Sequence, residues 1–307
     1  MTLAMQTRSA SDFQRGPLRR SSQNLTSTPS SPVVEAVDFC RSKPRLVELE
    51  KQLYYLANDD GNLQEVTKTC QSLLSDCDSV NGIFNVFCSC SWVDRYCEPV
   101  ISQLFYELVS SQHDSSNGTL LLTELETACE ELLKVLTHLG TPNTLQFNVV
   151  SLLYNLSRLS SLPSSHQEAV QSYLEEIARA LWPYSKPSAP NLWANEAFCD
   201  AQCDILKACG KVLEEKCPVN TERTFQMIIG KLVSGDISKY SRFRLLEIRE
   251  LRSSGWKVSA ATMNYYKESY LKVRFFCLHV HECLWYMWFR TSSNSIKPGQ
   301  TQGNDWV

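Results

Sequence analysis

Apolar residues recur at every third or fourth position along most of this chain, and this spacing constrains the fold more than any other feature. The clearest stripe is formed by Leu122, Leu125, Cys129, Leu132, Leu136 and Leu139. Side chains with this spacing lie on one face of an α-helix. Gly140 and Pro142 follow the stripe and predict that the helix ends there.

Shorter stripes predict a succession of further helices. The first begins at Pro44, which suits a first helical turn, and the second begins after Asn62, which forms a capping pair with Glu65. These stripes contain Leu46, Leu49, Leu53 and Leu56; Leu63, Val66, Cys70 and Leu73; Leu145, Val149, Leu152, Leu156 and Leu159; and Val170, Tyr173, Leu174, Ile177 and Leu181. After a proline-rich break, helices are predicted near 194–216, 221–233 and 240–253.

The succession of helices determines the predicted fold class. No segment shows the strict alternation of apolar and polar residues that is typical of strands. Helices joined by short connections pack as antiparallel neighbours. The sequence therefore predicts an all-α protein, either a HEAT-like superhelix of antiparallel helix pairs or an irregular bundle.

Composition divides the chain into three parts. Residues 1–33 are rich in Ser, Pro and Arg, hold few apolar residues and are predicted to be disordered. Residues 34–273 form the predicted helical domain, and residues 274–307 form an aromatic-rich extension. In the first part, Thr28-Pro29 and Ser31-Pro32 match kinase motifs, although chance matches in a solvated tail are the simpler interpretation.

Charge and cysteine content indicate a cellular setting. The formal net charge of -3 gives no general attraction to nucleic acid, so contact with RNA requires a local basic patch or a protein partner. The start of the chain lacks the apolar core of a signal peptide. The 13 cysteines have irregular spacing, which favours reduced thiols in the cytoplasm or the nucleus.

Reactive arrangements are few. The chain contains no Gly-rich phosphate loop, no GxSxG elbow and no HExxH motif, so we expect no catalytic residue and no cofactor. Cys277, His279, His281 and Cys283 offer zinc-type ligands. However, alternate residues of a strand lie about 6.6 Å apart, which is too far for four ligands around one ion. We therefore predict no metal site.

The most apolar run of the chain lies at residues 275–289. It is shorter than the roughly 20 residues that a membrane span needs, and it contains Glu282. A buried or partner-binding helix is the favoured interpretation. A membrane anchor remains the alternative.

Basic residues gather around residues 239–257. In this region Lys239, Arg242, Arg244, Arg249, Arg252 and Lys257 are opposed by only two glutamates, Glu247 and Glu250. Helical spacing places Arg242 and Arg249 on the same side of the helix. This group predicts a surface for RNA phosphate or for an acidic protein, formed by Arg242, Arg249, Arg252, Trp256 and Lys257. Exposed arginines balanced by local glutamates are the alternative interpretation.

Four segments between about 199 and 271 resemble the C-terminal half of MIF4G domains, the middle domain of the scaffold of the translation-initiation cap complex. They read LKACGKVLEE from Leu206, FQMIIGKLV from Phe225, RFRLLEIRELRSSGW from Arg242 and ATMNYYKESY from Ala261. Among members of the family, the chain is most similar to the small single-domain translation regulators. They include proteins that bind the histone stem-loop-binding protein, the nuclear cap-binding complex or the poly(A)-binding protein.

The resemblance implies a superhelical fold and a non-enzymatic adaptor. Partners of the implied kind are translation initiation factors, an RNA helicase or mRNA-bound proteins of the stem-loop, cap or poly(A) type. Such an adaptor acts by raising the effective concentration of one mRNA-bound factor near another. A HEAT-like interaction scaffold in another pathway, such as trafficking, is the alternative.

Overall fold

The computed structural model describes residues 44–57, 61–75, 80–96, 98–111, 116–186 and 191–269, and these residues form helices and connecting segments without a strand. The helices are α2 (Pro44–Leu56), α3 (Leu63–Leu74), α4 (Val80–Cys90), α5 (Val100–Ser111), α6 (Ser116–Thr137), α7 (Thr144–Ser157), α8 (Ser164–Leu181), α9 (Glu196–Lys216), α10 (Pro218–Ser234) and α11 (Lys239–Ser253). Short 3-10 helices are η2 (Ser91–Tyr96), η3 (Trp182–Ser185) and η4 (Leu192–Ala194), and a last helix covers 260–269. The chain is all-α, as the sequence predicts.

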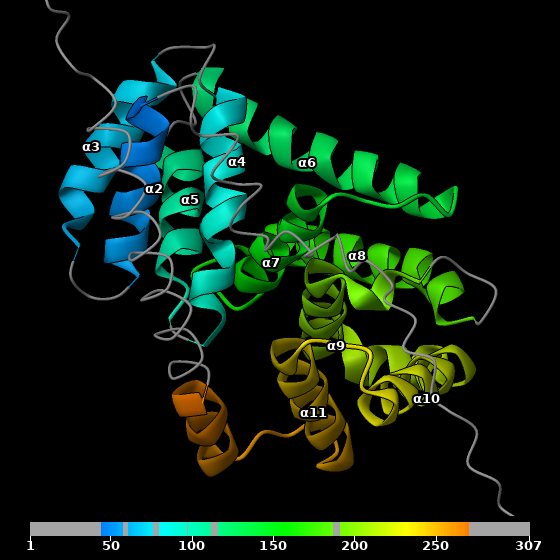
Figure 1. Cartoon of the computed structure of the whole chain (residues 1–307). Helices are drawn as coiled ribbons and strands as arrows, with labels where there is room; N and C mark the ends of the chain where they lie inside the picture. Colours follow the sequence, from blue (N-terminus) through cyan, green and yellow to red (C-terminus); the bar gives the residue numbers. More distant parts are fainter. Residues whose placement is uncertain are drawn as a thin grey trace, which may run out of the picture.

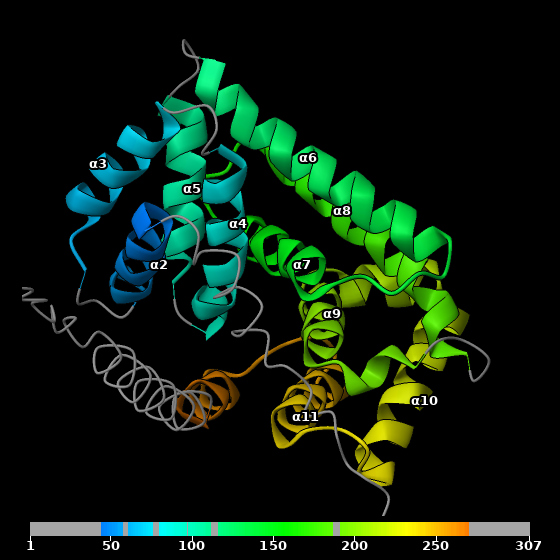
Figure 2. The ribbon, with the colours of Figure 1, turned by 45° about the horizontal axis from the view of Figure 1, so that its top comes forward.

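The helices follow one another through space in chain order. In Figure 1, α2 to α5 form one end, α6 to α8 the middle and α9 to α11 the other end. Figure 2 shows α6 and α8 running side by side. The two most extensively packed helices are α7 and α9, which contact each other and most of their neighbours. These two helices therefore form the centre of the described fold.

Most residues of the apolar stripes predicted from the sequence lie in one continuous core, but Leu63, the first residue of α3, is 44% exposed. Leu49, Leu53, Cys70 and Cys129 have no exposed surface, for example. An aromatic group adds to the core where α7, α9, η3 and η4 meet. Its central member is Phe198. The rings of Phe147, Tyr184 and Trp193 lie 5.1–6.2 Å from the Phe198 ring, measured between ring centres. Rings at such distances contribute stabilisation beyond the apolar area they bury.

Local signals account for most helix ends. Asn62 caps α3 by accepting from two backbone N–H groups, and Asn143 forms a reciprocal capping box with Gln146 at the start of α7. One prediction is corrected at the end of α6. Leu139 is not part of that helix, because α6 ends at Thr137 and Leu139 adopts a left-handed conformation with φ of 52° and 46% exposure. The Gly140 N–H then closes the helix by donating to the Val135 carbonyl.

Three sequence predictions concern residues outside the described part. They are the tail at 1–33, the cysteine and histidine run at 277–283 and the apolar run at 275–289. Among the helices that the structure describes, none has the length and apolar character needed to cross a membrane.

Candidate interaction surface

The candidate surface belongs to α11, whose inner side is fixed by a buried network of charges. The Arg244 guanidinium has no exposed surface and pairs with Asp200 at 3.0 Å, Asp204 at 2.7 Å and Glu247 at 2.8 Å. Arg95, which follows α4 in η2, pairs with the other oxygen of Asp204 at 2.9 Å. One buried carboxylate on α9 therefore joins α11 to η2, which lies 109 positions from Asp204 in the sequence.

This network stabilises the charged forms of its members. Burial by itself raises the pKa of Asp204, but Arg95 and Arg244 outweigh burial and lower it. The Ser151 hydroxyl on α7 also donates to Asp204 at 2.8 Å. Removing one partner of a buried ion pair costs about 3–5 kcal/mol because a charge is left without compensation. The network therefore holds α11 in one orientation against α9.

A second set of contacts fixes the turn at the end of α11. Gly255 and Trp256 both adopt left-handed φ values, 68° and 61°, which reverse the chain after Ser253. The Trp256 ring lies against Gly210 of α9, where a β-carbon would come within 2.0 Å of the ring. Its indole N–H donates to Glu214. Tryptophan is unusual in this backbone conformation, so the space at Gly210 and the bond to Glu214 are what hold it there.

The five predicted binding residues separate into two groups in the structure. Arg242, Arg249 and Lys257 are exposed, and no described carboxylate pairs with the two arginines. Arg252 instead pairs with Glu214 at 2.7 Å and Glu222 at 2.8 Å, and its side chain is 25% exposed. The Arg252 guanidinium also lies 4.3 Å from the centre of the Phe225 ring. Together with half-buried Trp256, Arg252 joins α9, α10 and α11.

The outer side of α11 combines charge with an apolar side chain. Leu246, one turn from both Arg242 and Arg249, is 42% exposed, whereas Leu245, Ile248 and Leu251 are buried. This outer face, defined by Arg242, Leu246 and Arg249, is called the α11 face below. Two guanidinium groups that pair with no described carboxylate, beside an exposed leucine, suit an acidic protein surface that also carries an apolar group.

The last helix extends this region. Tyr266 anchors it to α11, because the Tyr266 hydroxyl donates to Glu250 at 2.8 Å and its ring lies 5.1 Å from that of Phe243. Burial, together with the bond to Glu250, raises the pKa of Tyr266 well above its usual value. Tyr265, by contrast, is 61% exposed. Of the Tyr265-Tyr266 pair, the Tyr266 ring is therefore buried and the Tyr265 ring is exposed.

No pattern in the sequence directly indicates the buried network. Arg95 is one basic residue in a short 3-10 helix, and nothing nearby in the sequence marks it as buried. A weak signal existed in α9, where Asp200 and Asp204 stand one turn apart among residues of apolar character. Carboxylates at positions that face a core require partners.

The described residues contain no group of three or more histidine, cysteine, aspartate and glutamate side chains arranged to hold a metal ion. Burial raises the pKa of the Cys70 and Cys129 thiols to about 12, which keeps them protonated and weakly nucleophilic. The surface concavities at η3–α10 and α6–α7 do not reach Asp204 or Lys207, whose pKa values are both lowered. These lowered pKa values therefore result from packing within the fold.

A scan against protein-family models gives no match, and a search of curated proteins gives none either.

Proposed function

We propose that this protein is a MIF4G-type adaptor that regulates translation initiation by binding other proteins, without catalysing a reaction. One observation carries the proposal. The residues that give the C-terminal segment its resemblance to MIF4G domains, among them Gly210, Arg252, Gly255 and Trp256, meet in one packed unit of α9, α10 and α11. The resemblance therefore concerns residues that act together in the fold.

The finer architecture belongs to the same proposal. Successive helices such as α2 and α3, α7 and α8, and α10 and α11 contact each other across short connections. Such neighbours are antiparallel, and a HEAT-like superhelix consists of stacked pairs of this kind. We propose that the described helices form this type of array.

The α11 face is the proposed binding surface. The buried network fixes the inner side of α11, so Arg242, Leu246 and Arg249 are presented from a helix that is already ordered. A partner then loses less conformational freedom at this surface than at a flexible one. The partners we propose are initiation factors, an RNA helicase or mRNA-bound proteins, held close to one another so that their contacts become intramolecular.

The experiment is a pull-down from cytosolic extract with the tagged full chain, with and without RNase. We expect translation initiation factors or an RNA helicase to be retained after RNase treatment. The double variant Arg242→Glu/Arg249→Glu should lose them, because reversed charge repels an acidic partner. The matched control is Lys68→Glu/Lys211→Glu, which reverses two exposed cations on α3 and α9.

Two results would contradict this proposal. If the wild-type chain retains none of these factors, the translation role is wrong. If it retains them and the α11 double variant retains them equally, the role stands but the α11 face is not the binding surface. Retention that RNase abolishes would assign the contact to RNA.

A further inference from the structure

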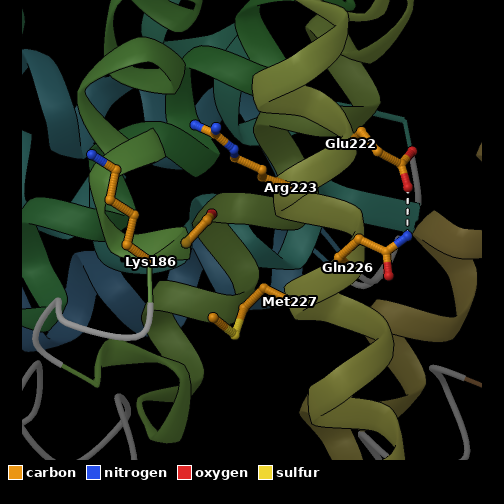
Figure 3. A pocket seen from close by; sticks show the side chains of 6 residues that line it. Lys186, Glu222, Arg223, Gln226 and Met227 are labelled. Atoms are coloured by element: carbon orange, nitrogen blue, oxygen red, sulfur yellow. Dashed lines mark hydrogen bonds between the residues drawn. The ribbon is translucent and has the colours of Figure 1, made fainter.

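A surface concavity lies between η3 and α10, and one of its lining residues, Glu222, also pairs with Arg252 of α11. It has a volume of about 680 Å³ and is lined by Ser185, Lys186, Glu222, Arg223, Gln226 and Met227. Figure 3 shows Arg223 and Met227 leaving α10 on the side of Lys186, and Glu222 and Gln226 leaving it on the other side. Lys186 and Arg223 are called the cationic wall below, Glu222 and Gln226 form the polar wall, and Met227 adds an apolar side chain beside Arg223.

The cationic wall has no counter-charge within the described fold. Lys186 and Arg223 are exposed, and no described carboxylate forms an ion pair with either of them. Glu222, the one carboxylate of the lining, is already engaged. It accepts hydrogen bonds from Gln226 and Arg252, which lower its pKa. The two cations are therefore available to a negatively charged group from outside.

The walls of this concavity are held in place. The Tyr184 hydroxyl in η3 donates to the Gly140 carbonyl at 2.7 Å, and the Tyr184 side chain is buried. The neighbouring Ser185 hydroxyl is hydrogen-bonded to the Thr224 hydroxyl of α10 at 3.2 Å. The backbone at Lys186, which follows Ser185, is therefore held in place beside α10. Because the backbone that carries the two cations is already ordered, less entropy is lost on binding.

We propose that this concavity, called the η3–α10 groove, binds an extended acidic segment of a partner protein. Acidic side chains of the segment pair with Lys186 and Arg223, and an apolar side chain contacts Met227, whose flexible thioether adapts to different shapes. The groove is open to solvent, so it buries too little of a small molecule to hold one tightly.

The charge pattern favours a peptide over RNA. Nucleic acids are bound by several cations that follow the phosphate backbone. The lining holds two cations, and the Glu222 carboxylate on the opposite wall repels phosphate. A peptide can place acidic groups at one wall and uncharged groups at the other.

The test uses the full-length chain and a random peptide library displayed on phage. Selected peptides are labelled with fluorescein, and their affinities are measured by anisotropy. We expect peptides that combine acidic and apolar residues, and their affinity should fall about tenfold, or 1.4 kcal/mol, on Lys186→Glu/Arg223→Glu. The neutral variant Lys186→Gln/Arg223→Gln should give a smaller loss, and helix content measured by circular dichroism should match the wild type in both.

The control variant is Arg242→Glu/Arg249→Glu, which reverses the same number of charges on the α11 face. Its peptide affinity should remain that of the wild type, so this proposal can fail or succeed independently of the translation role. The proposal is overturned if selection yields no acidic consensus. It is also overturned if Lys186→Glu/Arg223→Glu and Arg242→Glu/Arg249→Glu bind the selected peptides with the same affinity. It is also overturned if poly(U) RNA binds the wild-type chain and loses affinity on Lys186→Glu/Arg223→Glu while the peptides do not.

Discussion

The two sides of α11 use the same residue type for different purposes. On the inner side, Arg244 is fully buried and pairs with three carboxylates. On the outer side, Arg242 and Arg249 are exposed and pair with none of the described carboxylates. The desolvation of Arg244 is offset only because its partners are arranged around it, whereas the outer arginines remain hydrated. The comparison shows that a basic run in a sequence does not by itself mark a binding surface.

The largest expected effect comes from breaking the inner side. Arg244→Met keeps the apolar stem but leaves Asp200, Asp204 and Glu247 without this partner, so we expect a loss of about 3–5 kcal/mol in the free energy of unfolding. Arg242→Met, two positions away, should change it by less than about 0.5 kcal/mol. Urea denaturation measures both. Equal stabilities for the two variants would mean that the buried network does not stabilise the fold.

The next effect concerns the turn after α11. Gly210→Ala places a methyl group where the Trp256 ring lies, so the ring must move and we expect a loss of about 1–3 kcal/mol. Gly230→Ala in α10 is the matched control, because nothing lies within 4 Å of its added carbon. This control should stabilise the protein by about 0.5–1 kcal/mol through helix propensity. If Gly210→Ala is equally stabilising, Trp256 is not held by this contact.

Arg252 tests the boundary between the two sides. Its pairs with Glu214 and Glu222 are partly exposed, and its guanidinium lies over Phe225. We expect Arg252→Ala to lower the free energy of unfolding by about 1–2 kcal/mol, mostly through lost packing and hydrogen bonds. Arg249→Ala on the outer side should be nearly neutral. If the two substitutions have the same effect in thermal denaturation, Arg252 belongs with the outer face.

The smallest expected effect is a pH dependence at the inner side. Burial lowers the pKa of Lys207 to about 8, with Arg244 acting in the same direction against the attraction of Glu247. Because the unfolded chain binds more protons above pH 8, the free energy of unfolding should gain about 1 kcal/mol from Lys207 between pH 7.5 and 9. In Lys207→Met this gain should disappear. An identical pH profile for the variant would show that Lys207 is not the group responsible.

The sequence predicted helix type and position well where a helix has one buried face. The stripes of α2, α6 and α8 alternate with polar residues, so helical periodicity identifies them. No stripe marks α4, because ten of its residues, including Asn85 and Ser89, are buried on all sides. A helix that is buried all round shows no amphipathic period. The burial of α4 on all sides therefore could not be predicted from the pattern.

The candidate site was only partly predictable for a related reason. Helical spacing placed Arg242 and Arg249 together, but spacing along one helix does not reveal which neighbours cover it. The neighbours of Arg252 are Glu214 and Glu222, which lie at least 30 positions away in the sequence. Lys186 and Arg223 are likewise brought to the same wall of the η3–α10 groove from segments whose patterns contain no sign of each other.

By itself, the sequence determined the all-α class, most helix boundaries and the presence of basic residues around α11. These properties depend on local periodicity, capping and glycine, which act within a few residues. The tertiary structure alone decided which arginines are buried, because burial depends on which distant carboxylates surround them. Arg244 became part of the framework when Asp200 and Asp204 packed against it, while Arg242, two positions earlier on the same helix, stayed in water.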